Sequence, residues 1–210
     1  MIAKSVKKKG ILTKLLEKGL QILLIKECKK IGNLKIDIIS STTQIIKGTI
    51  DKIYINAEDI NYKDILFDNF FLEANQIKIK FNLINKELHF INNPIIELKI
   101  SISQNSLRSI LSSNNWSWIG NMISQELLNK ERLEVIKISN NKLLIKTSKE
   151  NVNINKVEKI NIKSYKGKIY MENKKYDKTI QIPIEDKIYI KNIYIENNLI
   201  NIFANSSISF

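Results

Sequence analysis

The feature that most constrains the fold of this chain is a change of hydrophobic period between residues 95 and 128. Up to Ile102 the apolar residues alternate with polar ones, as on a strand with one buried face. From Ser103 onward they recur every three or four residues, which is the period of an amphipathic helix. Ser103 and the Asn114-Asn115 pair are favourable N-cap residues. The segment therefore predicts two short helices inside a chain that is otherwise rich in strands.

These two helices supply the candidate ligand-contacting residues, because a curved sheet folded around apolar helices can bury a core or hold a lipid chain. Trp116 and Trp118 are the only tryptophans, and two positions apart on a helix they cannot share a face. We expect one to anchor the core and the other to lie at a groove mouth or membrane interface; packing of both in the core is the alternative. The candidate lipid-binding residues are Leu107, Ile110, Leu111, Trp116, Trp118, Ile119, Met122, Ile123 and Leu127.

The N-terminal segment combines positive charge with helical periodicity. Residues 1–32 contain nine lysines and two glutamates, hence a net charge of +7. Residues 11–31 predict an amphipathic helix with Gly32 as its stop. A basic helix of this kind can lie in a membrane interface, and packing on its own domain is the alternative. The candidate membrane-surface residues are Lys7, Lys8, Lys9, Lys14 and Lys18.

The overall charge narrows the choice of partner. The formal charge is +13 and the pI is near 9.6, which favours an anionic partner such as a membrane surface, a nucleic acid or an acidic protein. Of the 34 basic residues only Arg108 and Arg132 are arginines. Specific readout of bases usually draws on arginine, so the composition predicts diffuse attraction and no specific nucleic-acid site. A merely basic surface is the alternative.

Several functional classes lack their sequence signatures. One cysteine, Cys28, excludes an intramolecular disulfide and a cysteine metal cage, and one histidine, His89, excludes a two-histidine metal site. The chain has no glycine-rich phosphate loop and no nucleophile elbow. We expect a protein that is not an enzyme and that uses no metal or cofactor. The chain also lacks an 18-residue apolar run and a usual signal peptide, which predicts a cytoplasmic, peripherally membrane-associated protein.

Alternation returns after Leu128 and continues to the end of the chain. The pairs Asn140-Asn141 and Asn197-Asn198 predict hairpin turns, because asparagine tolerates positive φ. No proline- or glycine-rich linker divides the chain. The sequence thus predicts an α+β fold with a long antiparallel sheet, organised as a basic helix over residues 1–32 and one domain over residues 33–210.

Three stretches resemble a known family. They are residues 44–79, QIIKGTIDKIYINAEDINYKDILFDNFFLEANQIKI, residues 92–113, NNPIIELKISISQNSLRSILSS, and residues 182–210, IPIEDKIYIKNIYIENNLINIFANSSISF. In order and spacing, together with the opening helix, they resemble the LmeA-like phospholipid-binding family, formerly a domain of unknown function, and its cyanobacterial-type members. The chain departs from the family pattern at Ser106-Leu107, where family members tend to carry an acidic residue before the leucine. The resemblance implies a curved sheet wrapped around helices, as in tubular lipid-binding domains, and a non-enzymatic lipid-binding role.

Three functional hypotheses follow. The preferred one is a peripheral phospholipid-binding protein that holds acyl chains in an apolar groove between the sheet and the helices of residues 103–128. Burial of each acyl CH₂ group would contribute about 0.8 kcal/mol to such binding. The second is a membrane-associated scaffold or assembly factor that binds a protein segment in the same groove. The third is a non-specific nucleic-acid binder.

Overall fold

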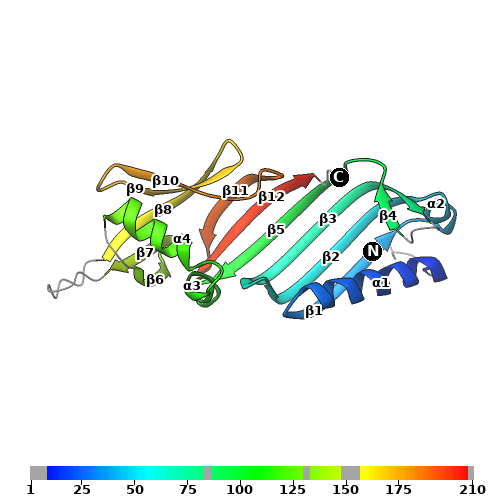
Figure 1. The fold of residues 1–210 in the computed structure, drawn as a ribbon, viewed down its shortest axis with the longest axis horizontal. Coiled ribbons are helices and arrows are strands. Elements are labelled where there is room, and N and C mark those ends of the chain that lie inside the picture. Colours follow the sequence, from blue (N-terminus) through cyan, green and yellow to red (C-terminus); the bar gives the residue numbers. More distant parts are fainter. Residues whose placement is uncertain (1–8, 83–86, 130–132, 148–156, 208–210) are drawn as a thin grey trace, which may run out of the picture.

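The computed structural model describes residues 9–82, 87–129, 133–147 and 157–207. The predicted α+β class is confirmed, but the strands form two antiparallel sheets and not one (Figure 1). The helices are α1 (Ile11–Glu27), α2 (Thr42–Ile46), α3 (Gln104–Ser112), α4 (Ser117–Met122) and the π-helical segment η1 (Ile123–Leu127). The strands are β1 (Lys30–Ile39), β2 (Thr49–Tyr62), β3 (Ile65–Asn82), β4 (Glu87–Phe90), β5 (Ile95–Ser103), β6 (Leu133–Ser139), β7 (Lys142–Thr147), β8 (Val157–Tyr165), β9 (Lys168–Asn173), β10 (Lys178–Ile182), β11 (Ile188–Glu196) and β12 (Leu199–Ser207).

The large sheet has the strand order β1-β2-β3-β5-β12-β11, and β4 pairs with the end of β3. The small sheet has the order β10-β9-β8-β7-β6, and an isolated bridge between Gly167 and Ile190 connects it to the large one. The two predicted hairpin turns are confirmed. Asn140-Asn141 and Asn197-Asn198 adopt φ between 49° and 60°, the left-handed region that a tight hairpin requires.

The N-terminal helix ends earlier than the sequence predicts. α1 stops at Glu27, and the prediction of a helix to residue 31 with Gly32 as its stop is wrong. The N–H of Lys29 donates to the carbonyl of Asn61 at 2.8 Å, and Lys30 already pairs with Asn61 in β1. Pairing with β2 therefore ends the helix, and the predicted boundary between residues 32 and 33 falls inside a strand.

The first turns of α3 and α4 are satisfied in different ways. Ser103 caps α3, as predicted, by accepting a hydrogen bond from the N–H of Ser106. The prediction of Asn114-Asn115 as the second cap is wrong, because α4 starts at Ser117. The carbonyl of Ser113 already accepts the N–H of Ser117 at 2.9 Å, and the side chain of Asn115 donates to Asp64 at 2.7 Å. The helix start is thus satisfied by the backbone, while the asparagine binds another loop.

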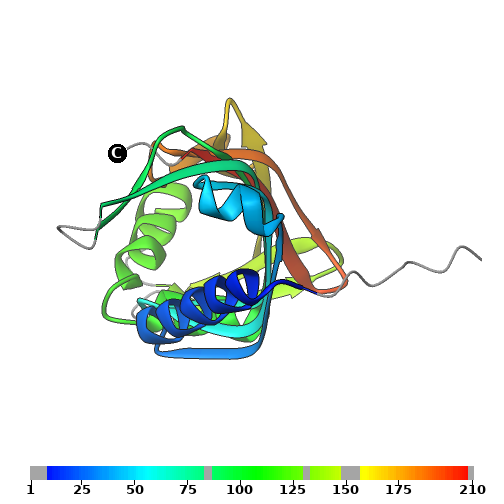
Figure 2. The same ribbon diagram turned by 90° about the vertical axis from the view of Figure 1, so that its right-hand side faces the viewer.

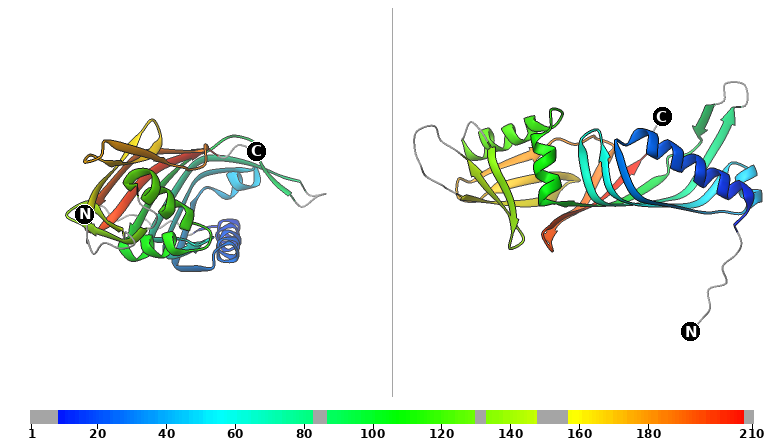
Figure 3. Two further views of the ribbon diagram at one scale, coloured as in Figure 1. Left: turned by 60° about the vertical axis from the view of Figure 1, so that its left-hand side comes forward. Right: turned by 90° about the horizontal axis from the view of Figure 1, so that it is seen from below.

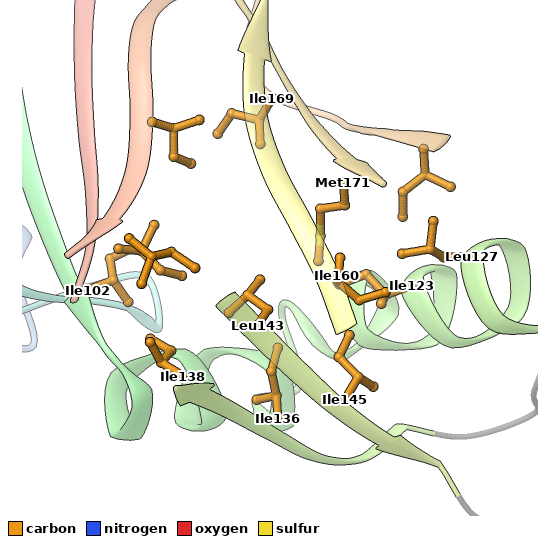
Figure 4. Packing of buried hydrophobic residues seen from close by; sticks show 14 of the residues in the cluster. Ile102, Ile123, Leu127, Ile136, Ile138, Leu143, Ile145, Ile160, Ile169 and Met171 are labelled. Carbon is orange, nitrogen blue, oxygen red and sulfur yellow. The ribbon is translucent and has the colours of Figure 1, made fainter. Parts of the chain in front are cut away.

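The apolar residues form two clusters. The larger core joins the inner residues of the small sheet to α3, α4, η1 and strands β5, β11 and β12 (Figure 4). The smaller core lies between α1 and strands β1, β2, β3 and β5, where Leu16 and Leu20 of the helix pack against the sheet. Seen along the long axis, α1 and α2 lie on the same side of the large sheet (Figure 2).

Candidate functional site

The predicted lipid-contacting residues of the central helices lie mainly in the larger core. Ile110, Ile123 and Leu127 are only 7, 2 and 0% exposed. Five others are partly buried against the same core: Leu107, Leu111, Trp116, Ile119 and Met122. The structure therefore brings eight of the nine residues together, as packing partners of two sheets.

The two tryptophans differ in their surroundings. The indole N–H of Trp116 donates to the carbonyl of Lys63 at 2.8 Å while its ring packs against the larger core. Trp118 is 44% exposed, and its indole N–H donates to the carbonyl of Asn115 at 3.1 Å. Trp116 is thus a core residue, and Trp118 is the one candidate on these helices that faces solvent.

Three hollows in the described surface have volumes of about 360, 620 and 360 Å³. The first lies between α1 and β1, the second on the large sheet and the third on the small sheet. None of these three is lined by α3, α4 or η1. A groove beside those helices remains a sequence-based prediction.

The most exposed apolar surface lies on α1. The outer stripe of α1, as we call it, consists of Ile11, Leu15, Ile22 and Ile25, which are 51 to 79% exposed and recur at helical spacing. The opposite side of the helix packs on the sheet through Leu16 and Leu20. The wide apolar band seen in the sequence is therefore only partly covered, and Leu23, which is 55% exposed, is uncovered outside the stripe as well. An uncovered apolar stripe is a candidate interaction surface.

The candidate membrane-surface lysines in and before α1 differ in their surroundings. Lys14 is exposed at the flank of the outer stripe, and Lys18 is exposed within the stripe, between Leu15 and Ile22. Lys9 instead forms ion pairs with Glu17 and Asp37. Desolvation opposes its charge, but the hydrogen bonds to Asp37 and Glu17 prevail and raise the pKa of Lys9 above its usual 10.5. Lys9 thus fixes the helix to β1, whereas Lys7 and Lys8 lie outside the described residues.

Glu17 connects α1 to the edge of the sheet. Its Oε1 accepts the N–H of Ile38 at 2.9 Å as well as the ammonium of Lys9. β1 is the outermost strand of the large sheet, so this N–H lies on its free edge. Glu17 therefore holds α1 along β1 with the outer stripe turned to solvent.

Further exposed isoleucines lie in segments at the end of the large sheet that carries α2. Ile46 in α2 is 71% exposed, Ile91 after β4 is 63% exposed, and Ile39 at the end of β1 is 48% exposed. The N-terminal end of α1 reaches the same end of the molecule (Figure 3, right). The outer stripe is therefore not the only uncovered apolar surface in this part of the protein.

The opposite face of the large sheet carries a row of aromatic rings. Tyr54 and Phe71 lie 6.1 Å apart between ring centroids, and Tyr194 stacks on Phe203 at 5.9 Å. The ammonium of Lys99 lies 5.2 Å from the Phe71 centroid and 5.8 Å from that of Phe203. These cross-strand contacts stabilise the sheet face.

Two further observations concern function. Among the described residues no group of three histidine, cysteine, aspartate or glutamate side chains is placed to hold a metal ion. No helix in the described ranges combines the length and the hydrophobicity needed to cross a bilayer.

Comparisons with protein-family models, with curated proteins and with solved structures returned no match.

Proposed function

We propose that this protein binds phospholipid as a peripheral membrane protein, and that the outer stripe of α1 is its membrane-contacting surface. The observation that carries the proposal is the exposure of Ile11, Leu15, Ile22 and Ile25 on one side of a helix whose other side is packed. A helix that is apolar on two sides needs two apolar neighbours, and the sheet supplies one of them.

Hydrophobic transfer supplies most of the binding free energy in this proposal. Complete burial of a leucine or isoleucine contributes roughly 1.5–3 kcal/mol, and the four residues of the outer stripe are at least half exposed before binding. Their transfer into the interface would contribute about 4 kcal/mol together, which is enough for reversible association.

Electrostatic attraction adds to this transfer. Lys18 lies within the stripe and Lys14 at its flank, and their stems can cover apolar surface while the ammonium groups reach the phosphate level. Each lysine near an anionic bilayer contributes roughly 1 kcal/mol. The net charge of +13 favours the same partner over a neutral membrane.

In this proposal the lipid contacts the outer surface of α1 and does not enter a groove inside the protein. The sequence suggested a groove beside α3 and α4, but the apolar residues there pack in the larger core. In this proposal the acyl chains stay in the bilayer, and the curved sheet serves as a rigid support for α1.

The test compares Ile22→Asp with Val157→Asp in the full chain. Both residues are aliphatic and similarly exposed, at 58 and 53%, but Val157 lies at the start of β8, away from α1. Co-sedimentation with vesicles of phosphatidylcholine and phosphatidylglycerol should weaken about tenfold or more for Ile22→Asp, because a charge must enter the interface. Val157→Asp should bind like the wild type.

Thermal unfolding of the same proteins supplies the control, and both variants should melt near the wild type because neither site is buried. Equal binding by the two variants, or no vesicle binding by the wild-type protein, would sink the proposal. A protein segment would then be the better candidate for the partner of the outer stripe.

A further inference from the structure

The hollow between α1 and β1 has the composition of an anion site. It has a volume of about 360 Å³ and is lined by Lys14 and Lys18 of the helix and by Lys35 of the strand, which also lines the hollow on the large sheet. Leu34 and Ile36 line it as well. Three cations beside apolar side chains are suited to a ligand that is anionic at one end and apolar at the other.

The positive charge of this hollow is not neutralised by the protein. Of the described residues, Glu17 is the only carboxylate that lines it, and Glu17 already pairs with Lys9 and accepts the N–H of Ile38. Within the described part of the chain, neither Lys14 nor Lys35 forms an ion pair with a carboxylate. An entering anion would therefore meet unpaired ammonium groups.

The backbone of β1 offers one more donor. In an antiparallel pair, residues two apart direct their N–H groups to the same edge of the strand. The N–H of Ile38 points to the free edge, where Glu17 accepts it. The N–H of Ile36 therefore points to the same edge, and Ile36 lines the hollow. Backbone N–H groups beside lysines are a common arrangement for binding phosphate oxygens.

The hollow lies beside the outer stripe, and this position favours a lipid phosphate as the anion. Lys14 and Lys18 are about one helical turn apart; Lys18 lies within the outer stripe, between Leu15 and Ile22, and Lys14 lies on its flank. A ligand held by these lysines would lie at the height of the lipid phosphates when the stripe enters the bilayer. We propose that the hollow binds the phosphate group of an anionic phospholipid, held by Lys14, Lys18, Lys35 and the N–H of Ile36. This inference rests on the proposed membrane association.

The test uses two vesicle types of equal negative surface charge. One contains phosphatidylglycerol, and the other contains cholesteryl hemisuccinate, an anionic lipid without phosphate. The wild-type protein should bind the phosphatidylglycerol vesicles about tenfold more tightly, because charge-assisted hydrogen bonds form only with the phosphate. Lys14→Gln and Lys35→Gln should each remove most of this preference.

Lys26→Gln is the matched control, because Lys26 is an exposed lysine of the same helix that does not line the hollow. It removes the same charge, so it should weaken binding to both vesicle types by the same factor and keep the preference. Wild-type binding without a preference, or an equal loss in all three variants, would overturn the headgroup site. Absence of binding to both vesicle types would instead contradict the proposed membrane association.

Free glycerol 3-phosphate distinguishes a lipid from a soluble phosphate ester. Glycerol 3-phosphate lacks the acyl chains that bring the lipid phosphate to the stripe, so we expect it at millimolar concentration to leave the preference for phosphatidylglycerol vesicles unchanged. Removal of the preference at micromolar concentration would assign the site to a soluble phosphate ester and overturn the lipid assignment.

Discussion

The central helices and the N-terminal helix have similar apolar periodicity but opposite surroundings. α3 contacts β3 and β5 of the large sheet and β6 of the small sheet, and η1 contacts β10. α1 contacts β1 and the short helix α2 and packs on one face of the large sheet only. A helix between two sheets buries apolar residues on more than one side, whereas a helix on one sheet leaves its outer side uncovered. The comparison shows that an apolar stripe becomes core or stays exposed according to what packs opposite it.

The largest expected difference is in stability. Leu127 in η1 is fully buried, whereas Leu15 in α1 is 62% exposed. Leu127→Ala should lower the free energy of unfolding by about 3 kcal/mol, because it removes transfer energy and leaves a cavity. Leu15→Ala should lower it by less than about 0.5 kcal/mol. Urea denaturation of both variants measures the difference, and equal losses would show that α1 is covered in solution.

The two tryptophans at the start of α4 give the same contrast between a core residue and an exposed one. Trp116→Ala should cost about 3 kcal/mol, since it removes both core packing and the hydrogen bond to Lys63. Trp118→Ala should cost about 1 kcal/mol because almost half of that side chain is exposed. Thermal or urea unfolding provides the measurement. A larger loss for Trp118 would contradict the assignment of Trp116 as the core residue.

The smallest expected effect concerns the attachment of α1. The pKa of Lys9 is raised in the folded protein, so its ion pairs stabilise the fold at pH below 10.5, and this contribution is lost as pH rises through the folded pKa. The side chain is 39% exposed, so solvent screening keeps the contribution below about 1 kcal/mol.

The comparison of wild type with Lys9→Gln isolates this contribution. The difference in unfolding free energy between the two proteins should be present at about pH 9 and should shrink toward about pH 12. A difference that stays constant over this range would mean that the ion pairs with Glu17 and Asp37 do not hold α1.

Local sequence determined the elements of the fold. Apolar residues that recur every second position predicted the strands, and apolar residues that recur every three or four positions predicted the helices. The pairs Asn140-Asn141 and Asn197-Asn198 predicted two hairpin turns, which the structure confirms. Ser103 as a helix cap was also predictable, because capping depends on residues three positions apart. These features depend on neighbours in the chain, which a sequence displays directly.

Tertiary structure decided how those elements are covered. The division into two sheets, the end of α1 at Glu27 and the core position of the central helices all depend on partners far away in sequence. The hollow joins Lys14 and Lys18 to Lys35, which belong to different elements, and only the docking of α1 along β1 brings them together. Periodicity specifies which residues share a face, but burial depends on what packs against that face, and only the folded chain supplies it.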